Sequence, residues 1–251
     1  MSISCISDIH VTTTKSKQYA ILLNFIKNEK VQNSEKVMFL GDIFDHLTGE
    51  HKQYIAKYKE FFSEVAKLLD GGREVFFLEG NHDFHFEKTF TLALHELCKD
   101  KEKVANFKYS NSPVKFQFNS KNFTFCHGDD LDTDNKAYQR WKRIYSSNAF
   151  GFLVSRVLPY NLVNYLGDKA SSDSRERGRA KFNYNREKAK YREAAKSYLN
   201  KHATDVLVAG HTHICDKVTW DGKTYVNIGF PQRDQTFLHI SKEVIEMISI
   251  Q

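Results

Sequence analysis

Five short polar blocks, each placed directly after an apolar strand-like run, are the feature that most constrains this chain. Four of the five contain glycine, which lets the backbone turn sharply where a strand enters a loop. In α/β folds, ligands bind outside the carboxyl ends of the strands, so side chains that follow strands can converge in one cleft. The blocks are Asp8-Ile9-His10, Gly41-Asp42-Ile43-Phe44-Asp45, Gly80-Asn81-His82-Asp83, His127-Gly128-Asp129 and Gly210-His211-Thr212-His213.

The polar side chains of these blocks offer oxygen and nitrogen donors and no sulfur. Such a set is typical of Mn, Fe or catalytic Zn ions rather than of a structural zinc knot. Seven candidate ligands exceed what one ion needs, and they fit two ions that share a bridging carboxylate. Each block alone is more typical of a turn or a structural histidine than of a metal site. Together and in this order, they predict a metal centre that acts on a phosphoryl group.

The order of apolar segments predicts an α/β fold that begins with parallel strands. Helix-like segments near Lys17–Val31 and His51–Leu69 separate the first strand-like runs, which are Ser2–Ser7, Lys36–Leu40 and Glu74–Leu78. The later chain predicts a hairpin around Asn119-Ser120-Lys121-Asn122 and a turn at Asp221-Gly222. Its further strands are expected at 205–209, 223–228, 236–240 and 244–250. A mixed pair of sheets faced by helices accommodates all of these segments.

Residues 131–202 interrupt the strands with mostly helical sequence. We expect them to form an inserted cap between two parts of one core domain, residues 1–130 and 203–251. Within residues 150–166, 11 of the 17 residues are Phe, Leu, Val or Tyr. Apolar helices of this kind can simply pack the cap onto the core. Alternatively, they can form a lid that admits acyl chains and contacts an anionic membrane.

The net charge of +6 is concentrated in residues 168–201, which hold 11 basic and 5 acidic residues, while the rest of the chain is balanced. A basic surplus favours an anionic partner. Because the surplus lies in the cap, we expect a diphosphate and an anionic inner-membrane surface rather than nucleic acid. No obligate protein partner is predicted.

The four cysteines form no Cys-x-x-Cys pair, which favours buried reduced thiols over disulfides or zinc ligands. The first residues resemble a strand rather than a signal peptide, and no apolar run is long enough to span a membrane. We therefore expect a cytoplasmic protein.

The five blocks resemble the calcineurin-like metallophosphoesterase superfamily, whose pattern is D-x-H, G-D-x-x-D, G-N-H-D/E, H and G-H-x-H. The resemblance implies a four-layer α-β-β-α sandwich with an inserted helical cap and two divalent metal ions, Mn²⁺ being the first candidate. By position, Asp8, His10, Asp42 and His213 would hold one ion, and Asp42, Asn81, His127 and His211 would hold the other.

The same resemblance implies a catalytic role for His82, which would contact the substrate phosphate or protonate the leaving oxygen. Asp83 is expected to fix the tautomer and orientation of His82 through a hydrogen bond. Asp45 is expected to support a ligand rather than to bind metal.

For four neighbouring residues the sequence leaves the role open. Asp129 and Asp130 are candidates to orient either His127 or the cap. His46 and His85 lie beside the motifs, and either a structural or a substrate-contacting role is compatible with the sequence.

A longer resemblance points to the UDP-2,3-diacylglucosamine diphosphatase family of bacterial lipid A biosynthesis. It rests on the run His127-Gly128-Asp129-Asp130-Leu131-Asp132-Thr133-Asp134, on Ala137-Tyr138-Gln139, and on a helical insertion of this size. The resemblance implies cleavage of UDP-2,3-diacylglucosamine to UMP and 2,3-diacylglucosamine 1-phosphate at the inner membrane. The candidate substrate contacts are Asn81, His82, Asn135, Ser171, Ser172, Arg175, Arg179 and His211.

Two departures keep other substrates open. The main branch of that family has Arg where this chain has His82, and it often has an acidic residue at the position of Asn135. The alternatives are the same chemistry on a nucleotide, phosphoprotein or nucleic acid, and a non-catalytic scaffold of the same fold.

Overall fold

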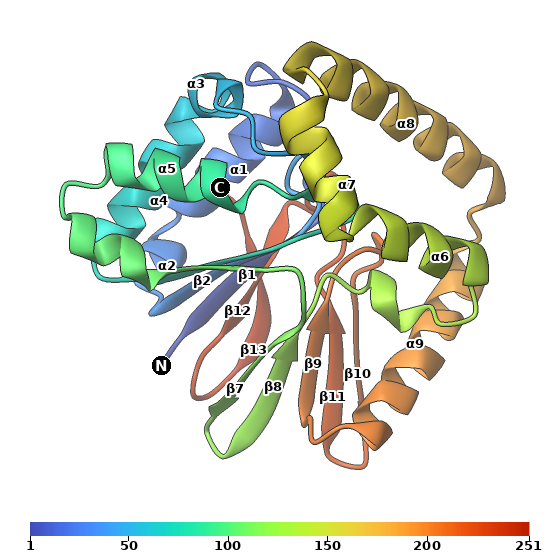
Figure 1. The fold of residues 1–251 in the computed structure, drawn as a ribbon. Helices are drawn as coiled ribbons and strands as arrows, with labels where there is room; N and C mark the ends of the chain where they lie inside the picture. The colour runs from blue at the N-terminus through green and yellow to red at the C-terminus, as the bar shows by residue number, and fades with distance from the viewer. Residues whose placement is uncertain (251) are drawn as a thin grey trace.

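The computed structural model describes residues 1–250, except for the side chains of residues 174, 175 and 177–181. Two sheets lie face to face between layers of helices (Figure 1). The first sheet has the order β13-β12-β1-β2-β4-β6, in which β1, β2, β4 and β6 run parallel. Its strands are β1 (Ile3–Ile6), β2 (Lys36–Leu40), β4 (Glu74–Leu78), β6 (Phe107–Ser110), β12 (Thr236–Ile240) and β13 (Ile245–Ser249).

The second sheet has the order β10-β11-β9-β8-β7, with β9 parallel to both of its neighbours. Its strands are β7 (Val114–Phe118), β8 (Lys121–Phe125), β9 (Val206–Ala209), β10 (Asp216–Trp220) and β11 (Lys223–Asn227). A separate parallel pair joins β3 (Leu47–Thr48) to β5 (Asp83–Phe84). Apolar side chains of the two large sheets, among them Met38, Phe125 and Val208, fill the space between them.

Helices cover the outer faces of both sheets. An aromatic-rich core that includes Phe25, Phe61 and Phe90 lies between the first sheet and its helices. Those helices are α1 (Lys17–Lys27), α2 (Glu29–Gln32), α3 (Gln53–Lys57), α4 (Lys59–Asp70) and α5 (Glu87–Leu97). Helix α9 (Tyr184–Lys201) covers the second sheet and buries Tyr191 and Leu199 against it. The predicted four-layer α-β-β-α sandwich is therefore confirmed.

Helix α9 lies within the segment that the sequence assigns to the cap, yet it forms the fourth layer of the sandwich. Ion pairs attach it there, because Arg192 binds both carboxylate oxygens of Asp216 at 2.7 Å. Lys188 reaches the same carboxylate, and Lys190 pairs with Asp132. Part of the basic surplus thus fixes a helix to the core. The domain limits at 131 and 202 stay a prediction.

The predicted strands agree closely with the structure, whereas three other details differ. The helix expected at 51–69 breaks at Tyr58 into α3 and α4. The β7–β8 turn contains only Asn119 and Ser120, both with positive φ, as a two-residue hairpin turn requires. Of the cysteines expected to be buried, Cys215 is exposed.

The remaining helices lie over the end of the sandwich toward which the parallel strands point (Figure 1). They are α6 (Lys136–Tyr145), α7 (Asn148–Phe152), a π-helical turn (Leu153–Val157) and α8 (Tyr160–Lys181). A Cβ atom at Gly167 would lie 2.0 Å from the ring of His46, so α8 approaches the core this closely only because of that glycine. Among the described helices, none has the length and apolar character to cross a bilayer.

Candidate metal centre

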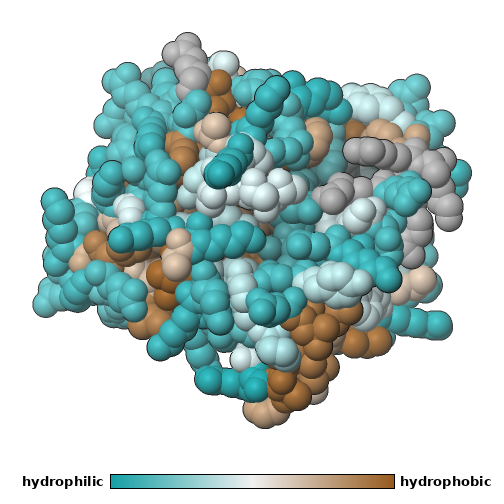
Figure 2. Space-filling model, turned by 90° about the horizontal axis from the view of Figure 1, so that it is seen from above, coloured by the Kyte–Doolittle hydropathy of each residue, from teal (hydrophilic) through white to brown (hydrophobic). Residues whose placement is uncertain are grey.

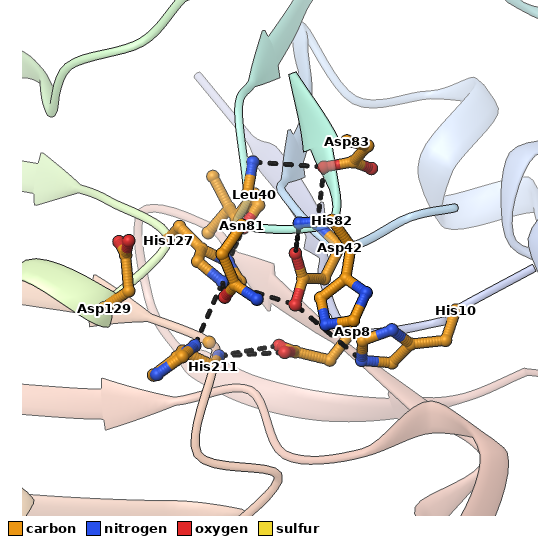
Figure 3. A network of polar contacts seen from close by, with 12 residues as sticks. Asp8, His10, Leu40, Asp42, Asn81, His82, Asp83, His127, Asp129 and His211 are labelled. Atoms are coloured by element: carbon orange, nitrogen blue, oxygen red, sulfur yellow. Dashed lines mark hydrogen bonds and ion pairs between the residues drawn. The ribbon is translucent and has the colours of Figure 1, made fainter. Parts of the chain in front are cut away.

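All seven predicted ligands lie at the carboxyl ends of five strands, and Figure 3 labels six of them, all except His213. Asp8 and His10 follow β1, Asp42 follows β2 and Asn81 follows β4. In the second sheet, His127 follows β8, and His211 and His213 follow β9. Positive φ is uncommon outside glycine and costs energy, so its clustering indicates a functional constraint. Five ligands share it, namely Asp8 (54°), His10 (51°), Asp42 (53°), His211 (69°) and His213 (57°).

Two motif glycines let the ligand loops approach one another. A Cβ atom at Gly80 would lie 2.2 Å from Oδ1 of Asp42. A Cβ atom at Gly210 would lie 2.3 Å from Oδ2 of Asp8. The backbone N–H of His211 donates to both oxygens of Asp8, at 3.0 and 2.8 Å, and so ties the first block to the last.

One group of ligands joins Asp8, His10 and His213. Nε2 of His213 lies 3.4 Å from Oδ1 of Asp8 and 3.1 Å from Nε2 of His10. The ring of Phe230 stacks on His213 at 4.5 Å between centroids and with an interplanar angle of 10°. Phe230 therefore covers one face of this ligand. The sequence motifs gave no signal for it, because it lies outside all five blocks.

A second group joins Asp42, His127 and His211. Nε2 of His127 is 3.2 Å from Nδ1 of His211 and 3.2 Å from Oδ1 of Asn81. Its Nδ1 faces the carbonyl oxygen of Leu40 at 2.9 Å, which fixes the ring. The four side chains named for the second ion thus surround one point.

Asp42 lies between the two groups. Its Oδ2 is 3.5 Å from Nε2 of His127 and 3.8 Å from Nε2 of His10. One carboxylate oxygen therefore faces a histidine of each group. This is the position that a bridging carboxylate would occupy between two ions.

The donor chemistry fits divalent metal ions. Ring nitrogens that face each other at 3.1–3.2 Å need a proton or a cation between them. Burial lowers the pKa of His10 and of His211 to about 4, so both rings are neutral near pH 7, as metal ligands must be. Burial also acts to lower the pKa of His127, but Asp42 and Asp8 outweigh it and raise that pKa to about 9. An ion bound at His127 would take the place of this proton.

A third cluster consists of His10, Asp45 and His82. Oδ1 of Asp45 lies 3.8 Å from Nδ1 of His10, whereas His213 faces the other ring nitrogen, Nε2. A carboxylate behind a histidine ligand orients the ring and raises its basicity. This placement fits the supporting role expected for Asp45.

The hydrogen-bond partners of His82 and Asp83 differ from those expected from the sequence. Nδ1 of His82 hydrogen bonds with the carbonyl oxygen of Asp45 at 2.8 Å, so the prediction that Asp83 fixes its tautomer is wrong. Asp83 is fully buried and accepts backbone N–H groups from Gly80, Asp42, Ile43 and Phe44 at 2.7–3.1 Å. Asp83 therefore shapes the turn that carries Asp42, because its carboxylate binds backbone N–H groups rather than the ring of His82.

Comparison with known proteins accords with this geometry. The profile of the calcineurin-like phosphoesterase family matches residues 1–215. The chain belongs to the calcineurin-like phosphoesterase family.

Relatives in this family include the UDP-2,3-diacylglucosamine hydrolase of Neisseria meningitidis serogroup B, 32% identical over 140 residues. That match covers 55% of this chain and 53% of the relative, so the chain spans about half the length of the relatives it matches in this way. The hydrolase of the same name from Pseudomonas aeruginosa is 26% identical over 213 residues, which cover 85% of this chain and 82% of the relative. Among solved structures, an archaeal phosphodiesterase aligns over 99% of both chains with 13% identity and a TM-score of 0.47.

The calcineurin-like phosphoesterase family implies the use of divalent metal, and this chain has the ligand groups for it. The predicted substrate contacts outside the centre lie at the start of α6 and in α8. Asn135 caps α6 by accepting the N–H of Tyr138 at 3.1 Å. Ser171 is buried in α8 and Ser172 is exposed, and their substrate role stays a prediction. The side chains of Arg175 and Arg179 lie outside the described residues.

We expect Asp83→Asn to weaken metal binding by about 10- to 100-fold, the usual effect of losing a group that supports a ligand. The amide would turn a donor toward backbone N–H groups and displace the turn that bears Asp42. The metal content after Mn²⁺ loading and gel filtration measures this effect. Asp221→Asn, in the exposed β10–β11 turn, is the matched control. Equal metal content in both variants would contradict the role of Asp83.

Proposed function

We propose that this chain hydrolyses the diphosphate of UDP-2,3-diacylglucosamine, releasing UMP and 2,3-diacylglucosamine 1-phosphate in lipid A biosynthesis. The observation that carries the proposal is the carboxylate of Asp42 placed between two groups of ligands at the strand ends. The family and the names of the relatives support this choice of substrate. The protein would act as a bacterial enzyme on the cytoplasmic side of the inner membrane.

Two divalent ions, Mn²⁺ being the first candidate, would be held by Asp8, His10, Asp42 and His213 and by Asp42, Asn81, His127 and His211. Such ions supply a water nucleophile and neutralise charge on the phosphoryl group. The residues of this chain hold that arrangement in place, because Asp8 ties the last ligand block to the first and Asp83 shapes the turn of Asp42.

His82 is the proposed acid. Its backbone N–H donates to Oδ1 of Asp42 at 3.0 Å, and Nδ1 faces the carbonyl oxygen of Asp45. A carbonyl oxygen only accepts, so Nδ1 carries a hydrogen and Nε2 is the atom that can exchange a proton with substrate. The ring meets that of His10 edge to face at 4.9 Å, which places it beside the first ligand group. When protonated, His82 can donate from Nε2 to the leaving oxygen.

The space between core and cap would receive the acylated sugar of the substrate. A cavity of about 490 Å³ lies between core and cap, lined among others by Glu79, His85, Tyr109 and Phe152. Glu79 directly precedes the Gly80-Asn81 block in the sequence, whereas the seven predicted ligands themselves are not among the residues that line the cavity. Its lining is mixed, with carboxylates and hydroxyls beside one exposed aromatic ring. It therefore suits the polar amide and hydroxyl groups of an acylated sugar.

The outer surface of the cap would contact the membrane. Among the described residues, ten of the eleven exposed large hydrophobic side chains lie between Trp141 and Tyr184. Phe152 and Tyr165 are each 64% exposed, and Val157 is 58% exposed. Figure 2 looks down on this end of the molecule and shows hydrophobic side chains gathered toward its lower edge. Exposed apolar patches on soluble domains mark interaction sites, and an anionic lipid surface would suit this one.

We expect purified, Mn²⁺-loaded protein to release UMP from UDP-2,3-diacylglucosamine. His82→Ala should keep its metal and lower kcat by roughly 10²- to 10⁴-fold, the usual contribution of a general acid. His95→Ala, at an exposed histidine of α5, is the matched control and should behave like the unchanged chain. Metal loss in His82→Ala would show that His82 is a ligand rather than the acid.

The same assay separates the alternatives. Absence of UMP release with metal bound would contradict the proposal. Hydrolysis of bis-p-nitrophenyl phosphate without hydrolysis of the lipid would favour a phosphoesterase acting on another substrate. Fewer than one ion per chain would favour a scaffold of the same fold.

For the membrane contact, we expect the double variant Phe152→Glu/Val157→Glu to bind vesicles of phosphatidylethanolamine and phosphatidylglycerol about tenfold more weakly, or worse. Removing one buried apolar side chain from the lipid already costs on the order of 1.5 kcal/mol. Val244→Glu is the control, because Val244 is an exposed apolar residue far from the cap in sequence and 41% accessible. Equal sedimentation of both variants with the vesicles would contradict the contact.

A further inference from the structure

Helix α6 joins two of the loops that carry predicted metal ligands. Its inner face meets Asp129, in the short 3-10 helix η2 (Asp129–Leu131), two residues after His127. The carboxylate of Asp129 is 3% exposed, and its Oδ2 accepts from Tyr138 at 2.7 Å, from Lys142 at 2.8 Å and from Tyr145 at 3.3 Å. Donors separated by four and three residues lie on one face of a helix, so a single carboxylate binds the whole inner face of α6.

The other end of α6 attaches to the loop after Asn81. Nε2 of His85 hydrogen bonds with the carbonyl oxygen of Tyr145, the last residue of the helix, at 2.6 Å. The N–H of His85 in turn donates to Glu79 at 2.7 Å. A Cβ atom at Gly151 would lie 2.9 Å from the His85 ring, so α7 also closes onto this histidine. Helix α6 therefore spans from the His127 loop to the Asn81 loop.

The hydrogen bonds of His127 show whether Asp129 orients His127 or the cap. Nδ1 of His127 faces the carbonyl oxygen of Leu40, and Nε2 faces Asn81 and His211. The carboxylate of Asp129 binds Tyr138, Lys142 and Tyr145 of α6 instead. Of the two roles open from the sequence, orienting the cap is the one that these contacts favour. A buried carboxylate that loses its paired cation is strongly destabilised, so Lys142 matters to this attachment.

The chain continues directly from α6 into an exposed apolar part of the cap, which includes Phe152, Leu153 and Val157. The position of that apolar surface is therefore set by α6 together with the loop of Glu50 and His51, which hydrogen bonds with Ser155 and Val154 at 3.1 and 2.8 Å. An acylated substrate must reach the ligands and the apolar surface at once. A small phosphodiester needs only the ligands.

We propose that helix α6, anchored on Asp129, is a positioning element that holds the apolar cap at a fixed place over the metal centre. By holding the cap there, α6 selects acylated substrates. This inference rests on the proposed function for its choice of substrate. Asp129, Lys142 and Tyr138 are positioning residues in it, and they need not touch the reacting atoms. The residues of α6 act by fixing the distance between the metal centre and the apolar surface of the cap.

The test compares two substrates in full-length, Mn²⁺-loaded protein. Lys142→Met and the milder Tyr138→Phe each remove one donor to Asp129. We expect kcat/KM for UDP-2,3-diacylglucosamine to fall, by up to about 10²-fold for Lys142→Met, mainly through KM, because misplacing a positioning element can cost that much. Hydrolysis of bis-p-nitrophenyl phosphate should stay within about twofold. Lys142→Arg, which keeps the charge, should recover most of the loss.

Arg143→Met is the matched control, because Arg143 is the next residue of α6 and is exposed. Amide hydrogen exchange across residues 136–158 provides a readout without substrate. It should quicken in Lys142→Met and stay unchanged in Arg143→Met. Metal content should be equal in all of these variants.

Each other outcome has a distinct meaning. Equal loss on both substrates together with loss of metal would overturn the inference, since Asp129 and its partners would then support the ligands. Unchanged kinetics and exchange in Lys142→Met and Tyr138→Phe would also overturn it. If the unchanged chain hydrolysed the diester and not the lipid, the proposed function would fail. The exchange difference alone would then decide whether α6 is anchored at Asp129.

Discussion

The carboxylate of Asp42 is the interaction on which the rest of this structure depends. Its Oδ2 faces His127 at 3.5 Å and His10 at 3.8 Å, so one acidic group belongs to two sets of donors. It stays there because its own backbone is left-handed and because Asp83 binds three consecutive N–H groups of the turn. Strain of this kind persists only where the surroundings enforce it. Two sheets are needed, since each supplies ligands from its strand ends.

The cap is joined to this centre by polar contacts at specific places. Asp129 binds the inner face of α6, His85 binds its last carbonyl, and Gly167 allows α8 to reach His46. Helix α9 attaches differently, through Asp216 and a packed apolar face. Part of the excess of Lys and Arg residues in the sequence therefore forms internal ion pairs. The exposed apolar side chains of the cap, more than its charge, then support the proposed contact with lipid.

Much of this architecture follows from sequence pattern, because buried parallel strands read as short apolar runs that end in polar blocks. The parallel strands at 36–40 and 74–78 were predicted to the residue for that reason. The strand at 236–240 was also predicted to the residue, although it pairs antiparallel with both of its neighbours. The role predicted for Asp83 was wrong, because a sequence pattern cannot distinguish a carboxylate that binds a histidine ring from one that binds backbone N–H groups. Phe230 and His85 were unassigned, since their contacts cross from one loop to another. The exposure of Cys215 depends likewise on packing that local sequence does not encode.

Anomalous diffraction from Mn²⁺-soaked crystals tests the central claim most directly. The account predicts two peaks about 3.5–4 Å apart, the usual separation in two-metal sites, with Asp42 touching both. Asp8, His10 and His213 should contact one peak, and Asn81, His127 and His211 the other. A single peak, or one bound by His10, Asp45 and His82 with none beside His127, would contradict the account.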